Sequence, residues 1–482
     1  TRSNRSNGGT RMMEIVKVIL LGILIYFIAL HAIYLLLIFL GGAQIRRYQG
    51  GITFTEFERI AKSTPSMPVS VIVPAYNEET IIVNTVENVL KLNYPSHEVI
   101  VVDDGSTDGT IEALKNHFGL RRVDKHGRKS IETREITAVY ESAEHPNLTV
   151  AAKENGRRAD AINAGATLAR YPLLCVIDAD CVIDPDGLLH MARPFLVDSR
   201  LAAAAGVVRP SNGLAVENGT ITRRGLPRTL LGLNQEVEYA RSFQWARTGL
   251  SRLRSMLCIS GALLLVKKSV FEEAGGPWPQ SITDDMEFAI RLNGHIYDRR
   301  NGRNHTLAYA PDAVCYTEVP ETVKLYASQR NRWQRGTLQS LLRHWRMIFT
   351  PRYGMTGIFG MPFFLIFEAL APLVELLAYT LAVVLLILGL ATIKEVLIFA
   401  FLAYITGVFI TLLAVLINES SRWRTASWGE FWKMILAIFT DNLGFHQFRL
   451  LCALVGTFEY IFLRRHDLGA KMERLTPATA AP

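Results

Sequence analysis

The chain has 482 residues, a hydrophobic content of 49% and a formal net charge of +8. This length allows roughly two or three domains with a sizeable core. A basic chain is one signature of nucleic-acid binding. However, no nucleic-acid motif is present and the basic clusters flank hydrophobic segments, so we expect no nucleic-acid partner. The five cysteines show no metal-ligand spacing, which favours a reducing, cytosolic environment for the central part of the chain.

The N-terminal part contains one long apolar segment. Residues 15–41 are almost uninterruptedly apolar and are long enough to cross a bilayer. Residues 1–14 precede this segment as a tail, and residues 42–66 follow it as a polar connector. Because the segment is too long for a signal-peptide core and no cleavage site is evident, we interpret it as a retained transmembrane anchor.

Residues 67–320 have the pattern of an α/β domain with an open, Rossmann-like sheet. Short connections between strands and helices predict a parallel right-handed unit. Asn77 is expected to cap a helix that ends near Leu90. Residues 116–147 lack clear periodicity and are interpreted as a surface insertion. Apolar runs predict strands at residues 69–73, 98–102, 148–151, 172–177, 201–208 and 258–266.

A pair of carboxylates, Asp178 and Asp180, directly follows the strand expected at 172–177. The carboxyl ends of parallel strands form the edge at which open α/β sheets bind ligands. Hard oxygen ligands placed this close suit Mg²⁺ or Mn²⁺, and such an ion suits a diphosphate. An isolated Asp-x-Asp is also typical of a simple acidic turn, so the choice depends on the other motifs of the chain.

Residues 321–353 predict an amphipathic helix that lies in the membrane interface, with aromatic residues and leucines on one side and arginines on the other. This helix contains the segment QRNRW at 329–333. Four of its arginines are interpreted as snorkelling side chains that reach the membrane surface: Arg330, Arg335, Arg343 and Arg346.

Residues 354–463 are predicted to form C-terminal transmembrane and interfacial helices. Two spans are expected at 364–390 and 396–417, and a hairpin or re-entrant pair is expected at 431–463. The distribution of basic residues places the loop near residue 424 and the tail at 464–482 in the cytosol. The sequence therefore predicts a multi-pass protein of the plasma or inner membrane, with residues 67–320 in the cytosol.

Five motifs follow one another along these elements: VIVPAYNEE at 71–79, VVDDGSTDGT at 101–110, NGRRADAIN at 155–163, TDDME at 283–287 and QRNRW at 329–333. With these motifs the sequence resembles the processive, membrane-embedded glycosyltransferases of family 2, the group of cellulose, chitin, hyaluronan and poly-N-acetylglucosamine synthases. The resemblance covers residues 68–350 in order. It implies a GT-A fold for residues 67–320 and a membrane-lipid environment for the helices.

The resemblance also implies a uridine diphosphate sugar as donor, either UDP-N-acetylglucosamine or UDP-glucose. Arg158 stands where the family usually has a lysine, so its contact with phosphate is expected to differ, because a guanidinium has a fork geometry that an ammonium lacks. For Glu78, helix capping is the alternative role. The residues expected to bind the donor are Pro74, Tyr76, Glu78, Asp104, Arg158, Asp178 and Arg332.

Within the same resemblance, Asp180 is the expected direct ligand of a Mg²⁺ or Mn²⁺ cofactor, and Asp178 assists it. Asp285 matches the aspartate of the family's Thr-Glu-Asp motif and is favoured over Asp284 as the catalytic base. Such a base removes the proton of the acceptor hydroxyl as it attacks the sugar. A single in-line displacement of this kind inverts the anomeric centre and gives a β-linked product.

The acceptor is expected to be the end of a growing polysaccharide. Trp333 would offer a flat ring face to the terminal sugar, next to Gln329, Ser260 and Gly261. Further along the chain, Glu368 and Glu375 lie on one face of the first C-terminal span. Carboxylates at this depth are either part of a conduit for the growing chain or satisfied by neighbouring helices.

Two other functions agree with the same motifs. One is a non-processive transferase that glycosylates a membrane lipid, because lipid-glycosylating enzymes have a similar order of motifs. The other is a catalytically inactive export or sensing subunit, against which the presence of all the key aspartates argues. The donor sugar, the linkage, the oligomeric state and any accessory membrane or regulatory subunit are left open by the sequence.

Overall fold

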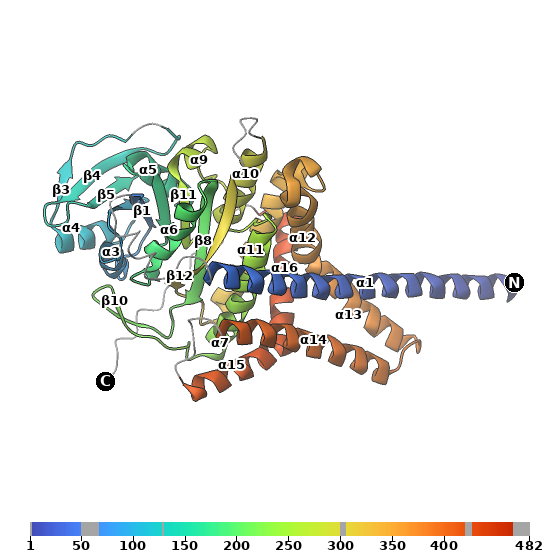
Figure 1. The fold of residues 1–482 in the computed structure, drawn as a ribbon. Helices are drawn as coiled ribbons and strands as arrows, with labels where there is room; N and C mark the ends of the chain where they lie inside the picture. The colour runs from blue at the N-terminus through green and yellow to red at the C-terminus, as the bar shows by residue number, and fades with distance from the viewer. Residues whose placement is uncertain (1, 50–66, 128–129, 299–304, 420–426, 466–482) are drawn as a thin grey trace.

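The computed structural model describes residues 2–49, 67–127, 130–298, 305–419 and 427–465. A mixed α/β unit lies beside a set of long helices, from which α1 projects (Figure 1). Three predicted segments fall wholly or largely outside the described residues: the connector at 42–66, the loop near residue 424 and the tail at 464–482.

The α/β unit is built on a ten-stranded sheet with the order β3-β4-β5-β2-β1-β6-β11-β8-β12-β7. A separate pair of short strands, β9 and β10, lies outside it. The strands are β1 Val69–Ala75, β2 His97–Asp103, β3 Leu120–Val123, β4 Ile136–Ser142, β5 Leu148–Lys153, β6 Leu173–Ile177, β7 Cys181–Ile183, β8 Leu201–Pro210, β9 Ala215–Glu217, β10 Thr220–Arg223, β11 Leu263–Lys267 and β12 Thr306–Thr317.

The central strands β5, β2, β1 and β6 run parallel, so their carboxyl ends meet at one edge. β11 runs antiparallel to β6 and pairs Leu263 with Ile177, which brings the residues before β11 to the same edge. β1 and β2 are joined by α3 (Ile82–Leu90), as the predicted parallel unit requires. The predicted α/β fold with an open sheet is confirmed.

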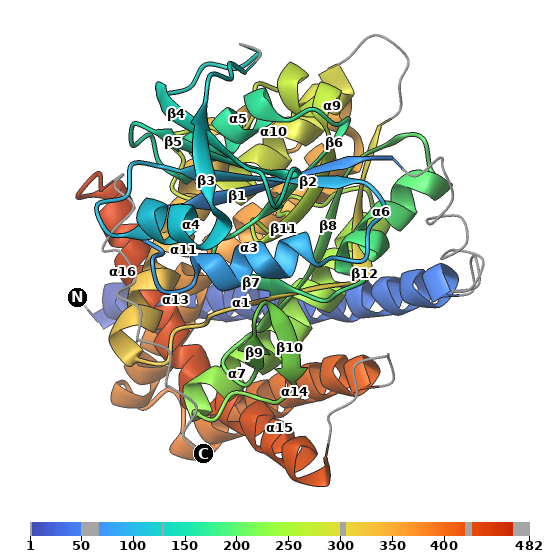
Figure 2. The ribbon, with the colours of Figure 1, turned by 90° about the vertical axis from the view of Figure 1, so that its left-hand side faces the viewer.

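Helices cover both faces of this sheet because alternate strand residues point to opposite sides. On one face, Val71 and Val101 pack with α3, α4 (Thr110–Phe118) and α6 (Gly187–Val197). On the other face, Ile72, Ile100 and Val102 pack with α5, α9 and α10. Figure 2 shows α3 and α4 on one side of the sheet and α5, α9 and α10 on the other. These last helices are α5 Arg158–Leu168, α9 Lys268–Glu273 and α10 Asp284–Asp298.

Two local predictions are wrong in this unit. Residues 116–147 are not a surface insertion, because β3 and β4 continue the sheet beyond β5 by antiparallel pairing. The strand expected at 258–266 begins only at Leu263, because the backbone turns before it, with the Leu263 amide donating to the Ser260 carbonyl at 3.3 Å.

Asn77 does not cap a helix, since α3 begins five residues later, at Ile82. Asn77 instead has a φ of 55°, a conformation that asparagine tolerates better than most residues. Its side-chain oxygen accepts a hydrogen bond from the backbone amide of Thr107 at 2.7 Å. The backbone amide of Asn77 donates to Ser106 Oγ at 2.8 Å. It therefore ties the loop after β1 to the loop after β2.

Two helices among the described residues are long and apolar enough to cross a membrane. One is the segment Glu14–Arg46 of α1 (Arg2–Gln49), and the other is Ile393–Leu416 of α14 (Ile393–Glu419). A third candidate is a pair of helices, Thr356–Ala369 and Ala371–Ile387, that meet at 41°.

This bend replaces the single straight span expected at 364–390. Pro372 lies at the start of α13, and proline cannot donate the hydrogen bond that would continue the preceding helix. The first half of the pair is also partly π-helical, at Phe364–Ala369. The elements here are η4 Thr356–Gly360, α12 Met361–Phe363, η5 Phe364–Ala369 and α13 Ala371–Ile387.

Residues 431–463 lie in two short helices that meet at a break. Leu443 and Gly444 have non-helical backbone angles, and Gly444 has a φ of 102°. The helices are α15 Trp428–Thr440 and α16 His446–Ile461, with η6 Asp441–Phe445 between them. The remaining elements are α7 Leu230–Tyr239, η1 Ala240–Ala246, α8 Arg247–Arg252, α11 Val323–Arg343, η2 Trp345–Met347 and η3 Pro351–Tyr353.

The snorkelling interpretation is wrong for two arginines of α11. Arg330 and Arg335 are buried, because α11 packs along α16 instead of lying free on a membrane surface. The Arg330 guanidinium donates to Glu238 Oε1 at 2.8 Å. Of the four arginines, only Arg343 and Arg346 have exposed side chains, and snorkelling stays a prediction for these two.

Glu368 and Glu375 both have protein partners. Glu368 accepts a hydrogen bond from the Tyr34 hydroxyl of α1 at 2.8 Å. Glu375 pairs with His446 Nε2 of α16 at 2.8 Å. This is the arrangement expected of carboxylates that are satisfied by neighbouring helices, and a role in a conduit stays a prediction.

We expect Gly165→Ala to destabilise the fold. A Cβ atom at Gly165 would lie 2.5 Å from Ile72 Cγ2, so α5 could not keep its close approach to β1. Such overpacking costs about 1–3 kcal/mol. Gly42→Ala is the control, since a Cβ atom at Gly42 would meet no other side chain or backbone atom within 4 Å. Thermal unfolding of the two purified variants compares them, and equal unfolding temperatures would contradict the packing argument.

Candidate active site

The predicted site residues gather at the edge formed by the carboxyl ends of the parallel strands. Asp104 follows β2 and Asp178 follows β6. Arg158 begins α5, and Asp284 begins α10. Gly261 lies in the turn before β11. Five separate segments of the chain thus contribute to one site.

Arg158 connects three of these segments. Its Nε donates to Asp178 Oδ1 at 2.7 Å, its Nη1 donates to Asp284 Oδ2, and its Nη2 donates to the Gly261 carbonyl at 2.8 Å. A Cβ atom at position 261 would lie 3.1 Å from Arg158 Nη2, so the close approach favours glycine there. The arginine at this position therefore cross-links β6, α10 and the turn before β11.

The side chains of this cluster shift one another's pKa values. Burial alone lowers the pKa of the Arg158 guanidinium, but the carboxylates of Asp178 and Asp284 raise it above its usual value. For Asp178, burial raises the pKa; Arg158 lowers it in part, and Asp180 adds to the rise. Arg158 consequently stays charged, and the Asp178 carboxylate is held by a permanent positive charge.

Asp180 and Asp178 form the only group among the described residues that meets the geometry of a metal site, together with Cys181. One ligand atom from each residue lies within 4.8 Å of the others. Burial raises the pKa of the Cys181 thiol well above its usual value, so it stays neutral and is a poor ligand for a hard cation. Two carboxylates remain, and their oxygen atoms fit Mg²⁺ or Mn²⁺.

Asp285 is placed differently from its neighbour Asp284. Asp284 is engaged by Arg158, whereas no ion pair to Asp285 occurs in the described part of the chain. Burial, followed by the charge of Asp284, raises the pKa of the Asp285 carboxyl, and Arg247 and Arg158 lower it only in part. A carboxylate with a raised pKa is a stronger proton acceptor, which is the property that a catalytic base needs.

Sequence reasoning missed two residues beside this carboxylate. The Cys258 thiol lies 3.9 Å from Asp285 Oδ2, and Arg247 Nη2 lies 3.3 Å from Cys258 Sγ. Cys258 belongs to an apolar run, and Arg247 belongs to a segment without a motif. Neither residue therefore gave a signal in the sequence.

Asp104 is buried and held by the protein itself. Its Oδ1 accepts hydrogen bonds from Lys153 Nζ at 2.7 Å and from the Gly156 amide at 2.9 Å. Lys153 also pairs with Asp160 at 2.6 Å. Lys153, another residue missed at the sequence level, thus fixes the loop after β2 to the loop after β5.

The other residues of the first motif lie at the end of β1. Pro74 is buried within the strand, and the Tyr76 side chain is 36% exposed at the edge. Glu78 is buried, and its amide donates to Thr110 Oγ1 at 2.8 Å. Of the three predicted donor-binding residues Pro74, Tyr76 and Glu78, Tyr76 is therefore the one most open to a ligand.

The QRNRW segment of α11 brings Arg332 to the same site. Arg332 lies close enough to Asp285 and Asp284 for both carboxylates to raise its pKa, although burial has the larger and opposite effect. The Trp333 ring packs partly against the sheet core, 4.2 Å from the Arg330 guanidinium. Ser260, in the turn before β11, is buried at the same edge.

Gln329 has an oxygen atom that the protein leaves unused. Its Oε1 is buried and has no hydrogen-bond partner among the described residues. A buried acceptor without a partner is costly, because it has lost its contact with water. This atom is therefore suited to accept a hydrogen bond from a bound ligand.

The fold and this site together define a glycosyltransferase with a GT-A sheet. A profile of the family described as "Glycosyltransferase like family 2" matches residues 65–336, more than half of the chain. The chain belongs to this family, which confirms the predicted membership. A second profile, "Chitin synthase", matches residues 297–451.

Two curated relatives are poly-beta-1,6-N-acetyl-D-glucosamine synthases. The protein from Staphylococcus epidermidis is 29% identical over 308 residues, covering 63% of this chain and 61% of the relative. The protein from Staphylococcus aureus (strain COL) is 28% identical over 276 residues, covering 57% and 56%. The chain thus spans about three fifths of the length of these relatives.

Among solved structures, the mannosyltransferase PcManGT from Pyrobaculum calidifontis, in complex with GDP-Man and Mn²⁺, has a similar fold. The TM-score is 0.51 at 19% sequence identity, and the match covers 89% of this chain and 99% of the other. At this identity the likeness concerns the fold.

We expect Arg158→Lys to loosen the site. A lysine keeps the charge, but it cannot contact Asp178, Asp284 and the Gly261 carbonyl together. Loss of part of these contacts should lower the free energy of unfolding by about 1–2 kcal/mol. Arg157→Lys is the matched control, because Arg157 is an exposed neighbour. Chemical denaturation measures both variants, and equal stabilities would show that the fork geometry contributes nothing.

The pH dependence of turnover should report the raised pKa of Asp285. The carboxyl must be ionised to accept a proton, so activity should fall as the pH drops through a value above the usual aspartate pKa of about 3.9. Asp284→Asn removes a negative neighbour and should move this acid limb to lower pH. Profiles of kcat/KM against pH, followed by nucleotide release, measure the shift. An unmoved limb would exclude Asp285 as the titrating group.

Proposed function

We propose that the protein is an inverting, processive glycosyltransferase that elongates a β-linked polysaccharide from a UDP-sugar. The observation that carries this proposal is the convergence of a candidate metal pair, Asp178 and Asp180, a high-pKa carboxylate, Asp285, and two arginines, Arg158 and Arg332, at one sheet edge. Transfer of a sugar from a nucleotide donor to a hydroxyl needs a cation site for the diphosphate and a base for the acceptor hydroxyl.

The donor side would be organised by the metal pair and the arginines. A bound Mg²⁺ or Mn²⁺ would supply Lewis-acid stabilisation of the leaving diphosphate. Arg158 pairs with Asp178 at 2.6 Å, and Asp180 is the proposed direct ligand of the ion. Arg332 would add positive charge to the diphosphate. Tyr76 and Asp104 mark the edge where the uridine would lie.

The chemical step would use Asp285 as base. Its carboxylate takes the proton of the acceptor hydroxyl, whose oxygen forms a bond to the anomeric carbon. The bond between this carbon and the donor phosphate oxygen breaks at the same time, and the nucleotide leaves with the electron pair. Attack from the opposite face inverts the centre, so an α-linked donor gives a β-linked product.

The acceptor would be positioned by α11 and the turn before β11. The unpartnered Gln329 oxygen can accept a hydrogen bond from a sugar hydroxyl. Trp333 lies four positions further along the same helix, and aromatic rings suit the apolar faces of sugars. Ser260 and Gly261 border the site from the opposite segment.

The membrane helices and the relatives favour a polymer as product. Two or three candidate spans lie beside the α/β unit, which supports a multi-pass membrane protein. A cytosolic location of the catalytic domain is part of the same proposal. Translocation of the chain beside Glu368 and Glu375 belongs to the same proposal. Since the relatives are named poly-beta-1,6-N-acetyl-D-glucosamine synthases, UDP-N-acetylglucosamine is the preferred donor.

The test is UDP release by the purified protein across a panel of nucleotide sugars, with and without Mg²⁺ or Mn²⁺. We expect release with UDP-N-acetylglucosamine, dependence on the metal, and a loss of about 10²-fold or more in Asp285→Asn. Asp284→Asn is the matched control and should retain more activity. Full activity in Asp285→Asn would overturn the assignment of the base.

The size of the labelled product separates the polymerase from a lipid-glycosylating enzyme. Labelled material of high mass is expected, and a single sugar on a lipid would disprove processive synthesis. The absence of turnover with every donor, from a folded protein, would instead indicate an inactive subunit.

A further inference from the structure

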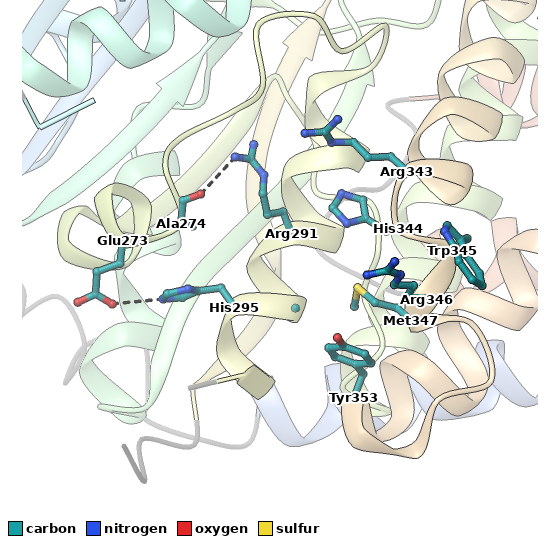
Figure 3. A pocket seen from close by; sticks show the side chains of 11 residues that line it. Glu273, Ala274, Arg291, His295, Arg343, His344, Trp345, Arg346, Met347 and Tyr353 are labelled. Atoms are coloured by element: carbon teal, nitrogen blue, oxygen red, sulfur yellow. Dashed lines mark hydrogen bonds and ion pairs between the residues drawn. The ribbon is translucent and has the colours of Figure 1, made fainter. Parts of the chain in front are cut away.

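A cavity lies away from the sheet edge, at the far ends of α10 and α11. Its volume is about 470 Å³, within the range of small-ligand pockets. Arg291 and His295 line it from α10, and Arg343, His344 and Arg346 line it from the end of α11 and η2. Figure 3 shows the side chains of Arg291, Arg343 and His344 facing the same space from two sides. None of the residues described at the sheet edge lines this cavity.

The cavity carries more cationic groups than carboxylates. Glu287 lies beneath it, with a side chain only 1% exposed, and pairs with Arg291 at 2.8 Å, His344 at 3.1 Å and Arg343 at 3.6 Å. Burial raises the pKa of Glu287, but its partners lower it below the usual value, so it is ionised. The Glu287 carboxylate is thus shared among three basic side chains, and the other carboxylate of the cavity, Glu273, pairs with His295 at 3.3 Å.

Two of the arginines retain binding capacity. Arg291 Nη1 and Nη2 already donate to the Ala274 carbonyl at 3.2 Å and to Glu287 at 2.8 Å, which leaves the buried Nε as its one donor without a partner among the described residues. Arg346 is exposed and lies 5.8 Å from the centre of the Trp345 ring, and no carboxylate pairs with it in the described part of the chain. Arginine presents donors in a planar fork that matches a phosphate group. The free capacity therefore favours a phosphate-bearing anion.

The surroundings of the cavity favour a ligand with acyl chains. Leu342, Trp345 and Phe349 lie on the segment that lines it and are 54%, 60% and 63% exposed. The bent candidate span begins directly afterwards, at Thr356, whose hydroxyl donates to Asn293 Oδ1 of α10 at 3.0 Å. Exposed tryptophan and arginine at the end of a span are typical of the membrane surface.

We propose that this cavity, the Arg291–Arg346 pocket, binds the phosphate headgroup of an anionic membrane lipid. Arg291, Arg343 and Arg346 contact the phosphate, and the acyl chains lie along Trp345 and the neighbouring apolar side chains. The bound headgroup would bridge α10, whose first turn carries the candidate base, and α11, which carries QRNRW. The proposal does not depend on the donor, the acceptor or the reaction.

The test is direct measurement of lipid binding by native mass spectrometry of the purified full chain in a neutral detergent. Titration with phosphatidylglycerol or phosphatidylcholine compares an anionic with a zwitterionic headgroup. We expect selective binding of phosphatidylglycerol, weakened about tenfold or more in the Arg343→Gln/Arg346→Gln double variant. Arg346→Gln alone should show a smaller loss in the same direction, and its exposed position makes misfolding a poor explanation.

Arg252→Gln is the matched control. Arg252 is an exposed arginine at the end of α8, a helix that packs against α1, and it lies outside the pocket. An unchanged affinity in this variant, together with the loss in the double variant, supports the proposal. Equal losses in both variants, or none in the double variant, would overturn it.

Inorganic phosphate and glycerol 3-phosphate distinguish the source of the phosphate. We expect neither to displace phosphatidylglycerol at comparable concentrations, because they lack the acyl chains that contact the apolar side chains. Displacement at equal concentration would assign the pocket to a free phosphate compound and would refute the lipid proposal. Since these readouts need no turnover, they are independent of the outcome for sugar transfer.

Discussion

The hydrogen bonds of Arg158 are the interaction on which the rest of the site depends. The residue stands at the first position of α5, and its guanidinium joins Asp178, Asp284 and the Gly261 carbonyl. The helix that carries it lies close to β1, because Gly165 has no side chain to separate them. Two acidic segments that would repel each other are thereby held on one sheet edge. This single side chain thus contacts both the candidate metal pair, at Asp178, and the neighbour of the candidate base, Asp284.

A second set of charges fixes the α/β unit to the helices beside it. Glu238 of α7 accepts from Arg330 of α11 at 2.8 Å and lies 3.5 Å from Arg449 of α16. Asp441, fully buried, pairs with Arg449 at 2.7 Å and with Arg241 at 3.2 Å. Separating buried ion pairs leaves uncompensated charges and is costly. The helix that carries QRNRW therefore cannot move without the helices near the candidate spans.

The sequence could predict the features that depend on local pattern. The parallel strands and their carboxyl edge follow from apolar runs with polar ends, and this pattern placed Asp178 and Asp285 in one site. The same pattern could not predict that β3 and β4 continue the sheet, since these two strands are only partly buried and lack a clear alternation. The burial of Arg330 depends on a partner ninety-two positions away in the chain, and no periodicity reveals such a contact. The position of Cys258 beside Asp285 could not be predicted for the same reason.

The arginine at position 158 also makes contacts that a lysine could not make together. A lysine at this position would bring one compact charge that can serve one carboxylate well, whereas the planar fork of arginine satisfies two carboxylates and a carbonyl at once. The preceding residue, Arg157, has a φ of 76°, a strained value for a side chain of this size. The side chain of the next residue makes the three hydrogen bonds of the site. The departure from the lysine expected in the family thus preserves the charge of the site and adds a rigid connection between its metal-binding and base-bearing segments.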